Sequence, residues 1–209
     1  MNKILVLIIA VVAIATGALV FQKSVNLAQP EHALYYQTPR AIKDFAMTDH
    51  QGQVFANEQL KGKWSWVFFG YTSCPDVCPT TLQELNFYYD DLKAIDENVQ
   101  VLLVSVDPMR DTVEKLSQYI AYFNAEFKAL TADHSVLFSF ARNLGLMYAI
   151  SDEKRDDNYL VDHSASIVLI NPQGSISAIF KPKHELGELP IISGEQLVSD
   201  FNKIVTLSK

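Results

Sequence analysis

The sequence predicts an α/β fold in which a central, mostly parallel sheet is flanked by helices. Apolar, β-rich runs at Trp64–Phe69, Val99–Val106 and Ile167–Ile170 have the composition of strands that are buried on both faces. Stretches with apolar residues at helical spacing separate these runs, as strand and helix alternate in α/β proteins. The composition of the 209-residue chain, 49% apolar and 20% charged, is ordinary for one globular domain once the N-terminal segment is set aside.

That N-terminal segment runs from Ile4 to Phe21 without a charge and follows Lys3. It is just long enough to cross a bilayer with some tilt. Ala13-Ile14-Ala15 resembles a signal-peptide cleavage site, but apolar residues continue beyond it, which favours an uncleaved membrane anchor over residues 1–21. With the positive end in the cytoplasm, the rest of the chain is expected to face the periplasm or an equivalent outer compartment.

Residues 22–40 are polar, contain Pro30 and Pro39, and show no apolar period, so they are interpreted as a tether. The folded domain is then expected to span residues 41–209. It opens with two short apolar runs, Phe45–His50 and Gln53–Phe55, on either side of Gln51-Gly52. This pattern predicts an N-terminal hairpin.

The later elements follow in order along the chain. Helical spacing and capping residues predict helices at Thr80–Ile95, Thr112–Phe123, Asp133–Leu144 and Gly194–Leu207. Asn171–Gly174 is a turn pattern that leads from the strand ending at Ile170 into a further strand, Ile176–Phe180. The net charge is −7 and no Lys/Arg cluster follows the first residues, which argues against nucleic acid as a partner.

The two cysteines of the chain, Cys74 and Cys78, lie between the first buried strand and the helix that is expected to begin at Pro79. The partial positive charge at a helix entrance favours thiolates. Two neighbouring thiolates either form a disulfide or hold one soft metal ion. A purely structural disulfide is the weaker explanation, since so short a loop constrains the unfolded chain little.

Two thiolates leave a metal ion short of ligands, and the third is sought among five histidines. A solvated surface position is the default for His32, His50, His134 and His184. His163 differs because it lies on a loop just before the strand Ile167–Ile170, where the sheet would bring it beside the cysteines. Its alternative role is that of a loop histidine bonded to Asp162. Two thiolates and one imidazole suit Cu(I) and, with a weak axial partner, Cu(II), whereas zinc normally takes a fourth ligand.

Two aspartates, Asp107 and Asp111, follow the strand Val99–Val106 at the same expected edge of the sheet. Either is a candidate for a weak ligand or a contact to a ligand. Asp111 more simply caps the helix that follows. Asp76, between the cysteines, is interpreted as a turn residue or a docking contact.

Three separated segments carry a family resemblance: GYTSCPDVCP (70–79), SVDPMRDT (105–112) and DHSASIVLINPQG (162–174). In order and spacing they resemble the signature segments of the Sco/SenC family of copper-binding, membrane-anchored, thioredoxin-like proteins, over about Asp44 to the C-terminus. The resemblance implies that Cys74, Cys78 and His163 are copper ligands and that Asp107 belongs to the site region. Ser73 departs from many members, at a position that is not a ligand.

The resemblance also implies a function: assembly of the copper A site in cytochrome c oxidase subunit II, by copper delivery or by keeping that site's thiols reduced. Other periplasmic copper chaperones or thiol reductases would be further partners. The first hypothesis is therefore a metallochaperone rather than an enzyme.

Two alternatives stay open. A thiol-disulfide oxidoreductase would use one cysteine to attack and the other to resolve. Thioredoxins, however, place two residues between their cysteines and a cis-proline before the facing strand, whereas this chain has three and His163. A peroxiredoxin-like peroxidase would need a Thr/Arg pair, for which Thr72 and Arg110 are only a weak hint.

Overall fold

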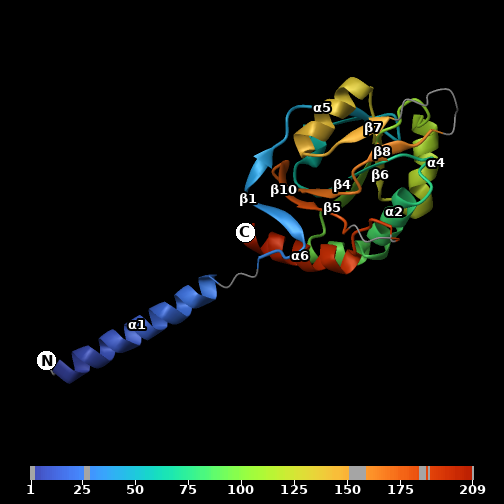
Figure 1. Ribbon diagram of the computed structural model, residues 1–209. Helices are drawn as coiled ribbons and strands as arrows, with labels where there is room; N and C mark the ends of the chain where they lie inside the picture. The colour runs from blue at the N-terminus through green and yellow to red at the C-terminus, as the bar shows by residue number, and fades with distance from the viewer. Residues whose placement is uncertain (1–2, 26–28, 151–158, 184–186, 188, 209) are drawn as a thin grey trace.

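The computed structural model describes residues 3–25, 29–150, 159–183, 187 and 189–208 (Figure 1). Its helices are α1 (Lys3–Val25), the short 3-10 helix η1 (Asn57–Leu60), α2 (Val77–Phe87), α3 (Tyr89–Ile95), α4 (Val113–Phe123), α5 (His134–Leu144) and α6 (Gly194–Leu207). Its strands are β1 (Ala33–Ala41), β2 (Ala46–Asp49), β3 (Val54–Ala56), β4 (Trp64–Gly70), β5 (Val99–Ser105), β6 (Lys128–Thr131), β7 (Tyr148–Ile150), β8 (Val161–His163), β9 (Ile167–Ile170) and β10 (Ser175–Phe180).

Eight strands form one sheet in the order β1-β10-β9-β4-β5-β6-β2-β3, and β7 pairs with β8 in a separate ribbon. The α/β class is confirmed. The expectation of a mostly parallel sheet was wrong, because only β4–β5 and β5–β6 pair in parallel and the other pairs in this sheet are antiparallel. Short connections, such as the turn at Asn171–Gly174, return the chain antiparallel, whereas parallel neighbours need a helical crossover.

Both faces of the sheet are covered. Every residue of β4 is buried. On one face Trp64 and Trp66 contact Phe201 of α6 edge to face, at ring-centroid distances of 5.4 and 5.3 Å. On the other face Phe69 approaches Phe140 of α5 at 6.1 Å. The central strands are therefore rigidly held, and their carboxyl ends bring the loops after β4 and β5 to one edge of the sheet.

The folded domain begins earlier than residue 41. Strand β1 occupies part of the expected tether and pairs antiparallel with β10. The buried carboxylate of Asp200 in α6 accepts hydrogen bonds from the backbone N–H groups of Glu31, His32 and Ala33 at 2.6–2.9 Å. Lys203 pairs with Glu31 at 2.7 Å. These contacts fix the chain from Glu31 onward, so the tether predicted for residues 22–40 is shorter than its polar composition indicated.

The predicted N-terminal hairpin is confirmed, since β2 and β3 pair antiparallel. The helix expected over Thr80–Ile95 is instead two helices, and it starts at Val77 rather than Pro79. The break falls at Tyr88, which has ψ 8° and packs against Gly194 at the start of α6. Tertiary packing thus divides a stretch whose apolar period alone is continuous.

The N-terminal helix α1 extends away from the sheet domain in Figure 1. Its segment Lys3–Phe21 is long and apolar enough to cross a membrane, and none of it is buried against the rest of the protein.

Candidate metal centre

The two cysteines lie where strand β4 gives way to helix α2. Cys74 follows the strand by four residues, is half-buried, and donates its backbone N–H to the carbonyl of Tyr71 at 3.2 Å. Cys78 is the second residue of α2 and is fully buried. Both are free thiols. One loop position and one helix position therefore contribute a sulfur each.

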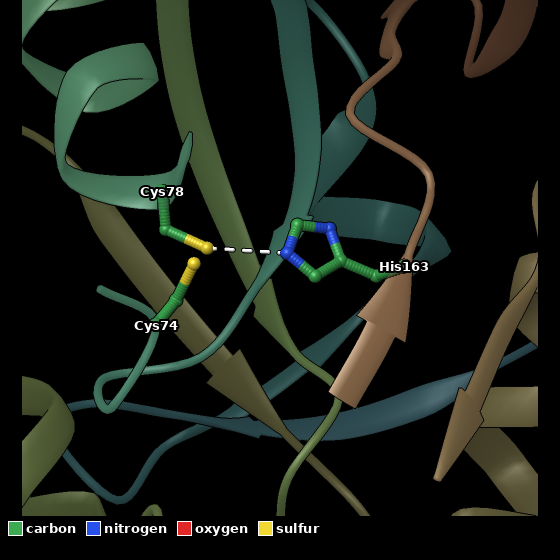
Figure 2. Close-up of side chains that lie close together, drawn as sticks. All are labelled: Cys74, Cys78 and His163. Carbon is green, nitrogen blue, oxygen red and sulfur yellow. Dashed lines mark hydrogen bonds between the residues drawn. The ribbon is translucent and has the colours of Figure 1, made fainter. Parts of the chain in front are cut away.

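The imidazole of His163 faces these sulfurs (Figure 2). Its Nε2 lies 3.3 Å from Sγ of Cys78, and the ligand atoms of Cys74, Cys78 and His163 all lie within 4.8 Å of one another. The sequence placed His163 on a loop, but it ends strand β8 and is held opposite Tyr148 of β7. The β7–β8 ribbon thus carries the histidine across to the helix entrance.

Contacts around the ring orient His163. Its Nδ1 lies 3.3 Å from the carbonyl oxygen of Ser164, and the rings of Phe68 and Tyr71 meet it edge-on at 5.9 Å. A proton on Nδ1 donated to that carbonyl leaves the Nε2 lone pair directed at the sulfurs. This is the arrangement expected of a metal-binding imidazole.

The two thiols are chemically unequal. The hydrogen bond from Cys78 lowers the pKa of the Cys74 thiol to about 4, against the opposing effect of its partial burial. Burial raises the pKa of Cys78 well above its ordinary value, and the neighbouring Cys74 raises it further. In the metal-free, reduced protein Cys74 is therefore the thiolate and Cys78 the proton donor beside it.

Gly70 was not singled out from the sequence, although it decides how closely Cys78 approaches the sheet. A Cβ atom at this position would lie 3.0 Å from Cys78 Sγ, 3.0 Å from Leu103 Cδ1 and 3.1 Å from Phe68 Cε1. The available signal was a glycine at the end of a buried strand, which often marks close approach of another group.

Asp111 does not cap α4 as predicted, because the cap is Thr112, whose side chain accepts from Lys115 N–H. The fully buried carboxylate of Asp111 instead accepts from the backbone N–H of Thr72 at 3.0 Å, from its hydroxyl at 2.5 Å, and from the Ser105 hydroxyl at 2.7 Å. Asp111 therefore ties the loop that carries Cys74 to the end of β5.

Asp107 lies outside the three-ligand group. Its buried carboxylate pairs with Arg110 and accepts a hydrogen bond from the Tyr159 hydroxyl at 2.6 Å. Arg110 reaches toward the site, with its guanidinium carbon 3.7 Å from the ring centroid of Tyr159 and 5.6 Å from that of Tyr71. Tyr71 and Tyr159 were not predicted, because only the fold brings them to the aspartate.

The remaining histidines have other surroundings where the chain is described. His50 accepts from Ala129 N–H at 3.3 Å, and burial lowers its pKa. His134 lies 3.2 Å from the Tyr148 hydroxyl. His184 lies outside the described residues.

The centre is reachable from outside. Cys74 and His163 line an open groove together with Pro75, Leu160 and Lys181, among others. An ion or a partner's side chain can therefore approach the two ligands without crossing the core.

Comparisons with known proteins identify the family. The SCO1/SenC family model matches residues 35–190. A Stutzerimonas stutzeri protein whose name describes it as copper-binding is 36% identical over 171 residues, covering 81% of this chain and 83% of its own. The copper-bound crystal structure of Arabidopsis thaliana ScoI has a TM-score of 0.67 and 28% identity, over 78% of this chain and 97% of that one. Copper-bound ScoI of Bradyrhizobium japonicum has a TM-score of 0.65 and 29% identity, over 78% and 99%. The resemblance and the thioredoxin-like fold it implied are thereby confirmed, and the chain belongs to the SCO1/SenC family.

Proposed function

We propose that this protein is a membrane-anchored copper metallochaperone that binds Cu(I) or Cu(II) through Cys74, Cys78 and His163. The observation that carries the proposal is the convergence of two sulfurs and one imidazole nitrogen within 4.8 Å. Two thiolates and an imidazole form a soft, low-coordinate donor set that fits copper, whereas zinc normally takes a fourth ligand.

The side chains of the site account for how copper would be bound and then passed on. Cys74 is already a thiolate, so metal entry requires the loss of only the Cys78 proton. Asp111 holds the Cys74 loop, and the β7–β8 ribbon holds His163. Because Cys74 and His163 line an open groove, a client thiolate can replace one protein ligand at a time.

The client is proposed from family membership: the copper A site of cytochrome c oxidase subunit II, with other periplasmic copper chaperones or thiol reductases as further partners. Helix α1 supplies the anchor, and residues 1–21 are proposed to remain attached. The domain then faces the periplasm or an equivalent outer compartment.

Anaerobic copper titration of the full chain in detergent tests the proposal. One equivalent of copper is expected to bind wild type. Cys78→Ser and His163→Ala should bind more weakly and with altered spectra, whereas His50→Ala, which removes a histidine outside the group, should match wild type. If His163→Ala held both Cu(I) and Cu(II) as tightly as wild type with an unchanged spectrum, the ligand assignment would be wrong.

A second candidate function is that of a thiol-disulfide oxidoreductase, and the inequality of the two thiols favours it. The Cys74 thiolate would attack a client disulfide and Cys78 would resolve the mixed disulfide. Two electrons and the Cys78 proton then pass to the client, whose two sulfurs leave as one thiol and one thiolate, while Cys74 and Cys78 form a disulfide. A wild-type protein that binds no copper yet reduces disulfides would establish this function in place of the first.

The peroxidase alternative has weaker support. Thr72 hydrogen-bonds to Asp111, and Arg110 pairs with Asp107 and lies over two tyrosine rings. These contacts occupy the two groups that peroxide activation would need.

A further inference from the structure

Three elements that are distant in sequence meet at Arg110, and one of them carries Tyr71, whose ring contacts that of His163. The loop after β5 supplies Asp107 and Arg110, the loop after β4 supplies Tyr71, and the chain entering β8 supplies Tyr159. Arg110 pairs with Asp107, whose other carboxylate oxygen accepts from the Tyr159 hydroxyl. Its guanidinium lies over both tyrosine rings, at 3.7 and 5.6 Å.

Tyr71 transmits this arrangement to the histidine. Its hydroxyl accepts the backbone N–H of Val161 at 3.3 Å, two residues before His163 on the same strand. Its ring also meets the His163 ring edge-on at 5.9 Å. A shift of Tyr71 would therefore move both the strand and the imidazole.

We infer that Arg110 is a positioning residue that holds β8 through Tyr71 and Tyr159 and thereby keeps the imidazole of His163 facing the two cysteine sulfurs. This inference rests on the proposed copper function and deepens it. Arginine suits the role because its planar guanidinium can stack on aromatic rings and pair with a carboxylate simultaneously, which a lysine ammonium cannot do with the same geometry.

The inference concerns only one of the three ligands. The loop that carries Cys74 is tied to the end of β5 through the Thr72–Asp111 hydrogen bonds, and the Cys74 N–H bonds to the backbone carbonyl of Tyr71 rather than to the ring that Arg110 contacts. Cys78 is held in helix α2. Loss of Arg110 should therefore impair the contribution of His163 and leave the two sulfur ligands in place.

A double-mutant cycle on the full chain in detergent tests this separation. Arg110→Gln is expected to weaken copper binding about 10- to 100-fold, the usual effect of losing a partner that orients a ligand. It should also weaken the imidazole nitrogen couplings in the pulsed EPR spectrum of the Cu(II) form. In the His163→Ala background the same substitution should change affinity less than about twofold, if the two residues act as one unit.

The matched control is Arg142→Gln, which removes an exposed arginine from α5 and should behave as wild type. Arg110→Lys keeps the charge but should restore neither the affinity nor the nitrogen couplings fully. Equal losses of affinity with and without His163, or unchanged nitrogen couplings in Arg110→Gln, would overturn the inference.

A metal-free measurement keeps this test separate from that of the proposed function. Hydrogen exchange of the amides of Val161 and Ser164 should be about tenfold faster in Arg110→Gln, the equivalent of roughly 1.4 kcal/mol of lost local stability. If wild type bound no copper, the proposed function would fail, and unchanged exchange would still overturn the inference. Should Arg110→Gln fold poorly, Tyr71→Phe removes only the hydroxyl bond to Val161 and should act in the same direction; unchanged exchange there would equally refute it.

Discussion

Gly70 and Cys78 lie so close that no side chain fits between them: a Cβ atom on Gly70 would lie 3.0 Å from Cys78 Sγ. Gly70 ends the buried strand β4, and Cys78 is in the first turn of α2. The φ angle of Gly70 is not positive, so a glycine is required at this position for space rather than for backbone conformation. The absence of a side chain on the strand thus lets the sulfur lie against the sheet and face His163.

We expect Gly70→Ala to displace Cys78 or Leu103 by a few tenths of an ångström. Overpacking of this kind costs typically about 1–3 kcal/mol, measurable as a lower midpoint of denaturant unfolding. Copper affinity should fall as well, because the displaced sulfur is a proposed ligand. In a Cys78→Ala background the stability cost of Gly70→Ala should shrink, and an identical cost in both backgrounds would contradict the proposed contact.

The reactivity of Cys74 should show its low pKa. Because that pKa lies near 4, the thiolate predominates above that pH and is lost only as pH falls through about 4. Metal-free, reduced protein should therefore react with iodoacetamide at Cys74 at pH 6, where an ordinary cysteine is protonated. Cys78→Ala removes the main stabilising hydrogen bond, so the reaction at pH 6 should slow. If the alkylation rate rose only near the ordinary thiol pKa, the assignment of Cys74 as the thiolate would be wrong.

Local sequence was a good guide wherever burial and spacing decided the structure. The runs at β4, β5 and β9 are buried throughout, as their composition predicted. The three proposed ligands also meet: local signals place the two cysteines between β4 and the helix, and the β7–β8 ribbon brings His163 to them.

Long-range pairing was less predictable. The direction of β9 and β10 depends on which strands they join, and an apolar run is compatible with parallel or antiparallel neighbours. Strand β1 is partly exposed, and its partners, β10 along the strand and Asp200 at Ala33, are far away in sequence. Asp111 looked like a helix cap because its partner Thr72 is also remote in sequence. Such contacts carry no local signal.

The buried hydroxyl of Tyr119 on α4 has no hydrogen-bond partner among the residues that the structure describes. A desolvated, unpaired hydroxyl is unfavourable, so Tyr119→Phe should leave stability unchanged or raise it by about 1 kcal/mol. The matched control is Tyr89→Phe, because Tyr89 donates to the carbonyl of Val99 and to Glu126. The free energy of unfolding of Tyr89→Phe should be lower than that of wild type by about 1 kcal/mol. Equal losses in both variants in denaturant titrations would show that the Tyr119 hydroxyl has a partner in solution.

Asp200 should control where the ordered domain begins. Asp200→Ala removes the acceptor of three backbone N–H groups and one partner of Lys203. We expect it to lower the free energy of unfolding by about 2 kcal/mol. Hydrogen exchange should accelerate at residues 31–35 more than in the central strands. The control is Glu97→Ala, which removes an exposed carboxylate. It should change neither the free energy of unfolding nor the hydrogen exchange at residues 31–35. Unchanged exchange at residues 31–35 would mean that β1 is held by its pairing with β10 alone.

Oxidation of Cys74 and Cys78 should act as a switch on copper binding. Both cysteines are free and their sulfurs are within 4.8 Å, so a two-electron oxidant can join the Cys74 thiolate to Cys78 with loss of the Cys78 proton. A disulfide has no thiolate to offer, and His163 alone is a weak site. Copper affinity should therefore fall by more than the roughly 10- to 100-fold expected from losing a residue that only orients a ligand. A dithiol reductant should restore the affinity. The double variant Cys74→Ser/Cys78→Ser should bind weakly with or without oxidant. If the oxidised wild type, with the disulfide verified by mass, bound copper as tightly as the reduced form, the sulfurs would not be the ligands and the switch would not exist.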